Sequence, residues 1–309
     1  MPKLSFVAPL QGYTDVAYRH YHAKVYGNVA DAYISPFLRV EHNEVRKRDI
    51  NDITSPLGNN HRLIPQIVAG GADEFNLILN TILQAGYKEV NLNLGCPFPP
   101  QLKHGRGAAL LLNAGEMARI ADIMLENPDI KFSAKMRLGI SMPDEWQQSI
   151  TAINRMPLEH ITVHPRTAAQ QYKGEIYFDE FRLIMQVINH PVIYNGELKT
   201  IEDIKKIYSD FPEICGIMIG RGLLANPALL NEWTEGVNWS VNKRMEAIMS
   251  LHEGIYTHYC NTLCGEAQIL SKIKPFWEYL IDSIDKRTAK LIKKATSVAK
   301  YNEAVGRIR

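Results

Sequence analysis

The stretch EVNLNLGCP, residues 89–97, is an apolar run with polar side chains, a glycine and a cysteine at its carboxyl end. Such a run is typical of a strand that is buried on both faces of a parallel sheet. Seven more short runs recur around it at intervals of about 30 residues, the length of a strand–helix repeat. The eight expected strands are Leu4–Pro9, Ala32–Phe37, Leu63–Val68, Glu89–Gly95, Phe132–Leu138, His160–His164, Pro191–Asn195 and Gly216–Ile219.

Amphipathic segments lie between these runs. Ala72–Ala85 has apolar residues at helical spacing (Phe75, Ile78, Leu79 and Ile82), and so has Ala114–Leu125 (Met117, Ile120 and Leu125). Eight strands that alternate with helices predict an α/β fold, a (β/α)8 TIM barrel. An open doubly wound sheet is the alternative, but it needs no eighth strand and usually begins with a glycine-rich fingerprint that this sequence lacks.

The strand pattern stops after Gly222, and Trp239–Arg309 is predicted to be all-helical. We expect one helix over an apolar stripe, a second around Ile269–Ile281 that Pro275 breaks or starts, and a third over Ile284–Val298. The stripe consists of Met245, Ile248, Met249, His252, Ile255, Tyr256 and Tyr259. The predicted domains are therefore a barrel, 1–236, and a helical domain, 237–309.

Charge is divided unevenly along the chain, whose net charge is +2. Residues 1–240 carry 23 Lys/Arg against 26 Asp/Glu, a net of −3, whereas residues 241–309 carry 12 against 7, a net of +5. This asymmetry indicates a polyanionic partner for the helical domain. A solvated helix face is the alternative explanation.

The four cysteines, Cys96, Cys215, Cys260 and Cys264, are too sparse for a disulfide scaffold. Reduced thiols and a cytoplasmic location are the expectation. No apolar stretch approaches the ~20 residues of a membrane-spanning helix, so no membrane association is expected. His258 with Cys260 and Cys264 is weak support for a metal site, and we predict none.

Polar residues at the carboxyl ends of barrel strands face the mouth where catalysis occurs. Here those ends carry Gln66, Lys135 and His164, and glycines follow the last two strands, where barrels usually bind phosphate. Lys135 fits a cation beside a ring system that becomes anionic on reduction. The pattern predicts a flat, phosphate-bearing, electron-accepting cofactor, best matched by FMN.

Several motifs together resemble the tRNA-dihydrouridine synthase family. They are APLQGYTD (8–15), NLNLGCP (91–97), GRGAALLL (105–112), AKMRLG (134–139), VHPRT (163–167), YNGE (194–197) and MIGRG (218–222). SPFLRV (35–40) and KIKPFWEYL (272–280) resemble its bacterial C-type branch. The chain departs from the family at Asn91, where Asp is more usual, at Pro165, where Gly is frequent, and at Phe98-Pro99-Pro100 after the cysteine.

The resemblance implies reduction of the C5=C6 bond of uridine in the tRNA D-loop, with FMN as cofactor and NADPH as electron donor. It implies Cys96 as general acid, Asn93 as a contact for the flipped uracil, and no stable protein partner for a monomeric enzyme. The expected cofactor residues are Pro9, Gln66, Lys135, His164, Asn195, Gly196, Glu197, Gly220 and Arg221. The expected tRNA contacts are Arg39, Arg137 and Tyr172 at the entrance and Lys272 and Lys274 on the RNA backbone.

Cys96 suits the acid because a thiol with a pKa near ~8.5 is protonated at neutral pH. Pro97 favours an extended Cys96 and removes an N–H that could stabilise a thiolate, and Gly105 and Gly107 give the following loop hinge capacity. The alternative is an inert buried cysteine.

Two other functions are compatible with parts of the pattern. An FMN barrel enzyme acting on a small molecule, such as dihydroorotate, has the same phosphate loops but does not need the basic carboxyl-terminal domain. A catalytically silent tRNA-binding protein does not need Cys96 and Lys135, which are both present.

Overall fold

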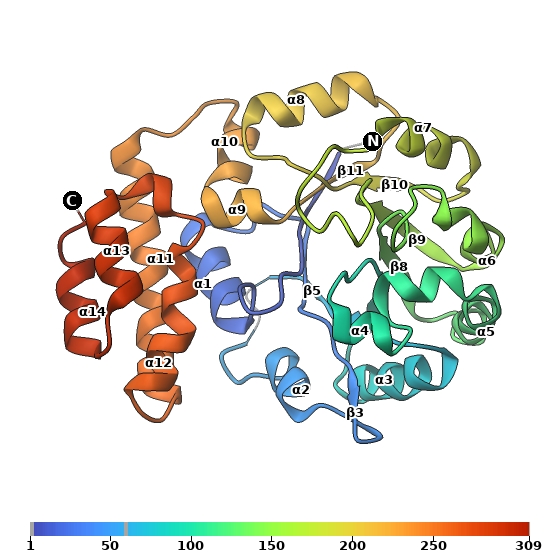
Figure 1. The fold of residues 1–309 in the computed structure, drawn as a ribbon, viewed down its shortest axis with the longest axis horizontal. Helices are drawn as coiled ribbons and strands as arrows, with labels where there is room; N and C mark the ends of the chain where they lie inside the picture. Colours follow the sequence, from blue (N-terminus) through green and yellow to red (C-terminus); the bar gives the residue numbers. More distant parts are fainter. Residues whose placement is uncertain (1–2, 59–60, 309) are drawn as a thin grey trace.

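The computed structural model of the chain describes residues 3–58 and 61–308. Parallel strands are surrounded by helices, and a group of helices follows at the carboxyl end (Figure 1). The strands are β1 (Leu4–Val7), β2 (Ala32–Ile34), β3 (Val40–Glu41), β4 (Glu44–Val45), β5 (Leu63–Ile64), β6 (Gln66–Ile67), β7 (Glu89–Leu94), β8 (Lys131–Met136), β9 (Leu158–Val163), β10 (Val192–Tyr194) and β11 (Gly216–Ile219).

The α-helices are α1 (Val16–Tyr26), α2 (Lys47–Ile53), α3 (Ala72–Gln84), α4 (Pro99–Lys103), α5 (Ala114–Leu125), α6 (Ile150–Arg155), α7 (Phe178–Val187), α8 (Ile201–Asp210), α9 (Arg221–Ala225), α10 (Leu229–Glu235), α11 (Val241–Thr262), α12 (Glu266–Ile273), α13 (Lys286–Lys294) and α14 (Val298–Val305). The 3₁₀ turns are η1 (Gly107–Leu112), η2 (Glu145–Ser149), η3 (Lys274–Trp277) and η4 (Ile281–Ser283). None of the helices in the described residues is long and apolar enough to cross a membrane.

The main sheet closes on itself at Pro65. Its order is β5-β2-β1-β11-β10-β9-β8-β7-β6, so β5 and β6 lie at its two ends. Only Pro65 separates them in the chain, while β5 pairs with β2 and β6 pairs with β7. Proline has no N–H to donate, which interrupts the ladder. β5 and β6 are therefore one barrel strand, and the predicted eight-stranded barrel is confirmed.

The outer helices bury the predicted stripes with one exception. Phe75, Ile78 and Leu79 of α3 are buried as expected. In α5, however, Met124 is buried and Leu125 is 47% exposed. The buried stripe starts at Met117 and follows the helical spacing i, i+3, i+4, i+7, so its last residue is Met124. Leu125 therefore faces solvent.

The helical region contains one helix more than predicted. α12 ends before Pro275, as the proline requires, and continues only as the turn η3. The expected third helix, Ile284–Val298, is shorter in the structure, and a further helix follows it: α13 ends at Lys294, and the Ser297 side chain accepts from the Lys300 N–H and so begins α14. Ser297 is thus the N-cap of α14. A serine side chain that bonds to the backbone in this way favours the start of a helix over its interior.

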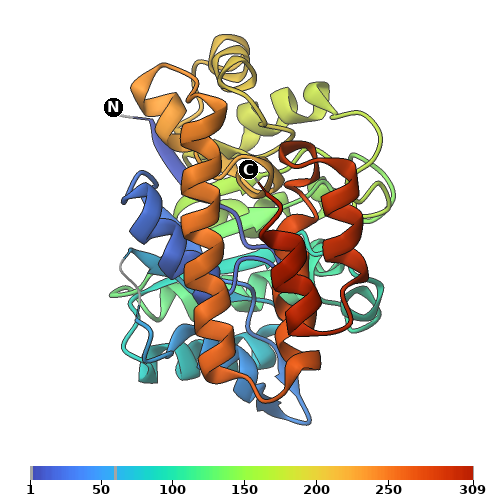
Figure 2. The same cartoon turned by 90° about the vertical axis from the view of Figure 1, so that its left-hand side faces the viewer.

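The helical region shares its core with the outer wall of the barrel. Ile248, Leu251 and Ile255 of α11 belong to one cluster with Ala17 and Tyr18 of α1. α11 lies beside α1 in both views of the molecule (Figures 1 and 2). Helices that follow the barrel in sequence are thereby packed against the helix that follows its first strand.

Candidate active site

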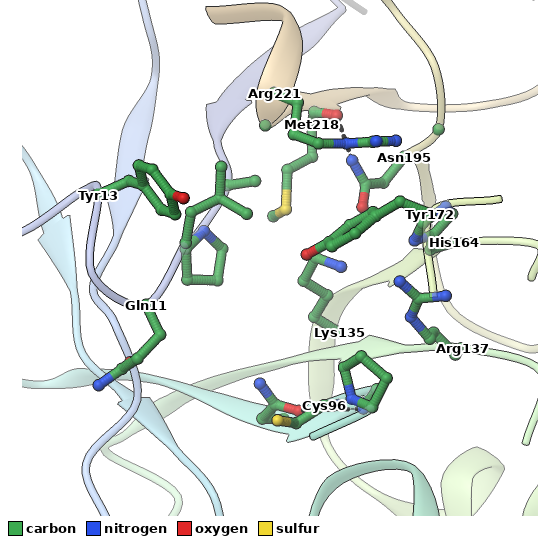
Figure 3. A pocket seen from close by; sticks show the side chains of 18 of the residues that line it. Gln11, Tyr13, Cys96, Lys135, Arg137, His164, Tyr172, Asn195, Met218 and Arg221 are labelled. Carbon is green, nitrogen blue, oxygen red and sulfur yellow. Dashed lines mark hydrogen bonds between the residues drawn. The ribbon is translucent and has the colours of Figure 1, made fainter. Parts of the chain in front are cut away.

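A cavity of about 550 Å³ opens at the carboxyl ends of the barrel strands (Figure 3). All the residues predicted for the acid, the cofactor and the uridine entrance line it. They are Cys96, Pro9, Gln66, Lys135, His164, Asn195, Gly196, Glu197, Gly220, Arg221, Arg39, Asn93, Arg137 and Tyr172. Parallel strands closed into a barrel direct their carboxyl ends to one mouth, so residues far apart in sequence meet there.

A chain of amide hydrogen bonds runs across the floor of the cavity from β8 to Cys96. Asn91 Nδ2 donates to Ser133 Oγ at 2.8 Å, and Gln66 Nε2 donates to Asn91 Oδ1 at 2.7 Å. Asn93 Nδ2 then donates to Gln66 Oε1 at 2.8 Å. Asn93 Oδ1 in turn accepts the backbone N–H of Cys96 at 2.8 Å. Each bond determines the orientation of the next amide, so the position of Cys96 depends on the whole chain.

Cys96 is held closely in the turn after β7. Gly107 has a φ of 63° and a Cβ there would lie 2.7 Å from the Cys96 Cβ, so only glycine fits this backbone approach. The Ala108 N–H donates to the Cys96 carbonyl at 3.3 Å. Burial raises the pKa of the Cys96 thiol. This effect outweighs that of the nearby cations Arg137 and Lys135, which lower the pKa. The thiol therefore keeps its proton at neutral pH.

Two polar groups at mid-mouth have no partner in the described part of the chain. The Lys135 ammonium makes no hydrogen bond or ion pair there, and burial, followed by the charge of Arg137, lowers its pKa to about 7. His164 Nε2 is buried without a hydrogen bond. Burial, followed by neighbouring cations, lowers the pKa of His164 well below its usual value, so the ring is neutral. Groups left in this state are suited to bind a ligand.

The loops after β10 and β11 offer free backbone donors. The N–H groups of Gly196, Gly220 and Arg221 donate to no acceptor within residues 3–58 and 61–308. Asn195 Nδ2 donates to the Met218 carbonyl at 2.7 Å and links the loop after β10 to strand β11 (Figure 3). Free backbone N–H groups at the ends of these strands suit an anion.

Glu197 organises the cations on this side of the mouth. Its carboxylate pairs with Arg166 at 2.7 Å, with Lys199 at 2.9 Å and with Arg221. Burial pushes the pKa of Glu197 upward, but these partners lower it to about 2. The backbone φ of 42° at Glu197 is a strained value for a residue with a side chain. Glu197 thus fixes Arg166 and Arg221 relative to each other at this side of the mouth.

The predicted entrance residues form a cationic and aromatic rim. The Arg221 guanidinium lies 4.1 Å from the centre of the Tyr172 ring, and that of Arg137 lies 5.4 Å from it. Arg137 also donates to the Thr167 carbonyl at 2.9 Å. Arg39 pairs with Glu41 at 2.5 Å. The half-exposed Tyr172 ring stands across the cavity from Tyr13 (Figure 3).

Lys272 and Lys274 lie outside this cavity. Lys272 Nζ pairs with Asp15 Oδ2 at 2.7 Å, and Lys274 Nζ donates to the Ala295 carbonyl near the end of α13. Both ammonium groups are therefore engaged inside the chain.

Several residues of the wall are not among those predicted from the sequence. Gln11 and Tyr13 come from the turn after β1, Phe98 from the segment after Cys96, and Tyr279 from the helical region. Gln11 and Tyr13 belong to the motif APLQGYTD, whose position at the end of the first strand is a signal for both. No pattern in the sequence shows that Tyr279 reaches the barrel mouth.

Several known proteins are similar to this chain in sequence. The dihydrouridine synthase family matches residues 6–304. A tRNA-dihydrouridine(16) synthase of Pseudomonas syringae pv. tomato is 31% identical over 240 residues, 73% of each chain. A probable tRNA-dihydrouridine synthase of Helicobacter pylori is 29% identical over 252 residues, 73% of this chain and 68% of the relative.

Among solved structures, morphinone reductase has a similar fold, with a TM-score of 0.51 at 12% identity over 77% of this chain and 87% of that chain. The family match covers the barrel and most of the helical region, including all the predicted site residues. This chain belongs to the dihydrouridine synthase family.

Proposed function

We propose that this chain reduces the C5=C6 bond of a uridine in the tRNA D-loop, with FMN as cofactor and NADPH as electron donor. One observation carries the proposal: a neutral buried thiol and an unpaired ammonium line the same cavity as a set of free backbone donors. Relatives named for tRNA-dihydrouridine synthesis support the substrate.

The cavity residues fit FMN. The free N–H groups of Gly196, Gly220 and Arg221 suit its phosphate, because they donate to no acceptor in the described chain. His164 Nε2 suits the polar edge of the FMN ring, and so do the N–H and the oxygen lone pair that Gln66 has left beyond its two hydrogen bonds. Pro9 packs at the wall, and Lys135 provides a positive charge for a ring that becomes anionic on reduction. FMN, when bound, accepts a hydride from NADPH and supplies one to C6 of uridine.

Cys96 holds the proton that the reaction needs at C5. Hydride addition at C6 leaves negative charge at C5, and a proton must arrive there to complete the saturated bond. The buried Cys96 Sγ is protonated at neutral pH and lines the cavity. Transfer of that proton leaves a thiolate beside the positive charges of Arg137 and Lys135. The Asn93 side chain retains one N–H beyond its bond to Gln66, and it can donate to the uracil.

The rim is suited to a base that has left its stack. A uridine inside RNA must flip out to reach a barrel mouth, and aromatic and arginine side chains can stack on a flipped base. Tyr172, with Arg137 and Arg221 beside it, and Arg39 supply such groups.

The proposed tRNA-binding domain is the helical region, 237–309. Three exposed lysines of α13, Lys286, Lys290 and Lys293, share one face at spacings of four and three residues. Such a face suits the phosphate backbone. Lys272 and Lys274 stay candidate contacts, although a phosphate would have to replace Asp15 or the Ala295 carbonyl as their partner.

We also propose a monomer acting in the cytoplasm, because the chain lines its cavity with its own residues and tRNA is a cytoplasmic substrate.

Flavin release and NADPH oxidation test the proposal together. We expect the purified protein to be yellow, to release one FMN per chain on heating, and to oxidise NADPH faster when unmodified tRNA is added. A colourless protein that does not bind added FMN contradicts the cofactor assignment. A yellow protein that responds to a small acceptor such as orotate but not to tRNA contradicts the substrate assignment.

A further inference from the structure

The turn between β1 and α1 forms part of the cavity wall. Pro9, Leu10, Gln11 and Tyr13 line the cavity from this turn. Its own bonds are local: the Leu10 N–H donates to Thr14 Oγ1 at 2.9 Å, and the Thr14 N–H donates to the Leu10 carbonyl at 3.0 Å. A closed turn of this kind is held in place by its two ends, so the residue that begins α1 matters for the cavity.

The helical region holds the far end of this turn at Asp15. Asp15 is the N-cap of α1 and accepts the Tyr18 N–H at 3.3 Å. The same carboxylate pairs with Lys272 Nζ of α12 at 2.7 Å and accepts the Tyr259 hydroxyl of α11 at 2.9 Å. The Lys272 ammonium also lies 5.6 Å from the centre of the Tyr259 ring. Two helices of the helical region thus meet on one carboxylate of the barrel.

A second contact holds the turn at its tip. The Tyr13 hydroxyl donates to Glu278 Oε2 at 2.6 Å, and the Tyr13 ring meets the Tyr279 ring edge-on at 5.3 Å. Tyr13 and Tyr279 both line the cavity. The helical region therefore touches the turn at both ends of the Tyr13–Asp15 segment and completes the wall beside it.

The Asp15 carboxylate depends on its partners. Its side chain is only 17% exposed. Burial by itself raises its pKa, but the charge and hydrogen bond of Lys272, with the Tyr259 hydroxyl, hold the pKa below the usual value. A buried carboxylate deprived of its only ion-pair partner in the described chain loses more than a surface pair does, because water does not replace the partner fully.

We propose that Lys272 is a positioning residue that acts through Asp15 to hold the Leu10–Asp15 turn, and with it the wall of the cofactor cavity. The helical region thereby shapes the cavity as well as offering a surface to RNA. The role of the cavity rests on the proposed function, whereas the hold on the turn does not.

The test compares three variants of the full-length protein with a control. Lys272→Met removes the ammonium and keeps the apolar stem. Asp15→Asn keeps an N-cap acceptor and removes the charge, so it tests the same contact if Lys272→Met does not fold. The third variant is Asp15→Asn/Lys272→Met. Lys290→Met, an exposed lysine of α13, is the control.

Backbone hydrogen exchange without added flavin is the first measurement. We expect exchange in the segment 10–18 to rise about tenfold or more in each single variant and to rise little further in the double variant, because all three variants lose the same contact. Exchange in β8, an internal reference, and in Lys290→Met should stay at the wild-type rate. FMN affinity, measured by flavin fluorescence, should fall about tenfold in parallel with the exchange.

The proposal is overturned if the segment 10–18 exchanges at the wild-type rate in both single variants. It is also overturned if β8 accelerates equally, because Lys272 then supports only general stability. If exchange in Lys272→Met is unchanged but its tRNA binding depends less steeply on salt, Lys272 is a phosphate contact instead. The same flatter salt dependence is expected for Lys290→Met. A wild-type protein that binds no FMN refutes the proposed function, while the exchange result still decides the role of Lys272.

Discussion

The barrel mouth and the helical region differ in whether their lysines have partners within the chain. Lys135 at the mouth has no hydrogen bond or ion pair in the described residues, whereas Lys272 and Lys274 in the helical region are both engaged within the chain. Lys135 projects from a strand end into a cavity, where only a ligand can pair with it. Lys272 lies beside the start of α1 and Lys274 beside the end of α13, so groups of the protein already pair with both. A basic residue is therefore evidence for a ligand only where the fold leaves it unpaired.

The largest expected effect tests the chemistry at the mouth. In Cys96→Ala, dihydrouridine formation should fall about 10²–10⁴-fold because the proton donor at C5 is removed. Reduction of the flavin by NADPH should continue at the wild-type rate, since it does not use this proton. Stopped-flow absorbance and nucleoside mass spectrometry separate the two steps. The exposed Cys260→Ala is the control, and wild-type tRNA reduction in Cys96→Ala would return Cys96 to an inert thiol.

The next effect is the pH dependence of FMN binding. Burial lowers the pKa of Lys135 to about 7, so much of the free protein lacks the ammonium above that pH. The ring of reduced FMN is anionic, so next to Lys135 it favours the protonated form and raises the pKa of Lys135, and binding of reduced FMN takes up a proton above pH 7. The affinity for reduced FMN should therefore fall as pH rises from 7 to 9, by up to about tenfold per pH unit. Titrations of Lys135→Met should show a flatter profile. Equal slopes for both proteins would exclude Lys135 from the cofactor site.

A smaller effect sharpens the contrast within the helical region. Lys290→Ala/Lys293→Ala removes two exposed charges of α13 that have no partner in the described residues, and it should reduce the log–log salt slope of tRNA binding by roughly two. FMN content should not change. Lys272→Ala/Lys274→Ala is the matched double variant. It should change the salt slope less, because these two lysines have partners within the chain. A larger change of slope in the Lys272/Lys274 pair would show that RNA displaces their protein partners.

The smallest effect concerns stability alone. Ser297→Ala removes the N-cap of α14 and should lower the free energy of unfolding by ~1 kcal/mol. Ser250→Ala, at an exposed position within α11, should have almost no effect. Urea denaturation followed by circular dichroism measures both. Equal stabilities would show that the Ser297 hydroxyl contributes nothing to the start of the helix.

The sequence predicted the barrel well because each strand is a short apolar run with a polar end, and one closed sheet is the arrangement that buries all eight. The mouth followed from this, because closure brings strand ends such as Gln66, Lys135 and His164 together. The contacts of the helical region could not be predicted, since the packing of α11 on α1 is a tertiary choice that no local pattern records. Tyr279 and the Asp15–Lys272 pair follow from that packing alone.

The most direct test of the central claim is to map dihydrouridine in an unmodified tRNA transcript after incubation with the purified protein, FMN and NADPH. Digestion to oligonucleotides followed by mass spectrometry locates each uridine that has gained two hydrogens. The account predicts such a gain at a D-loop uridine, dependent on NADPH. A flavin-loaded protein that oxidises NADPH yet leaves every uridine of the tRNA unreduced would contradict it.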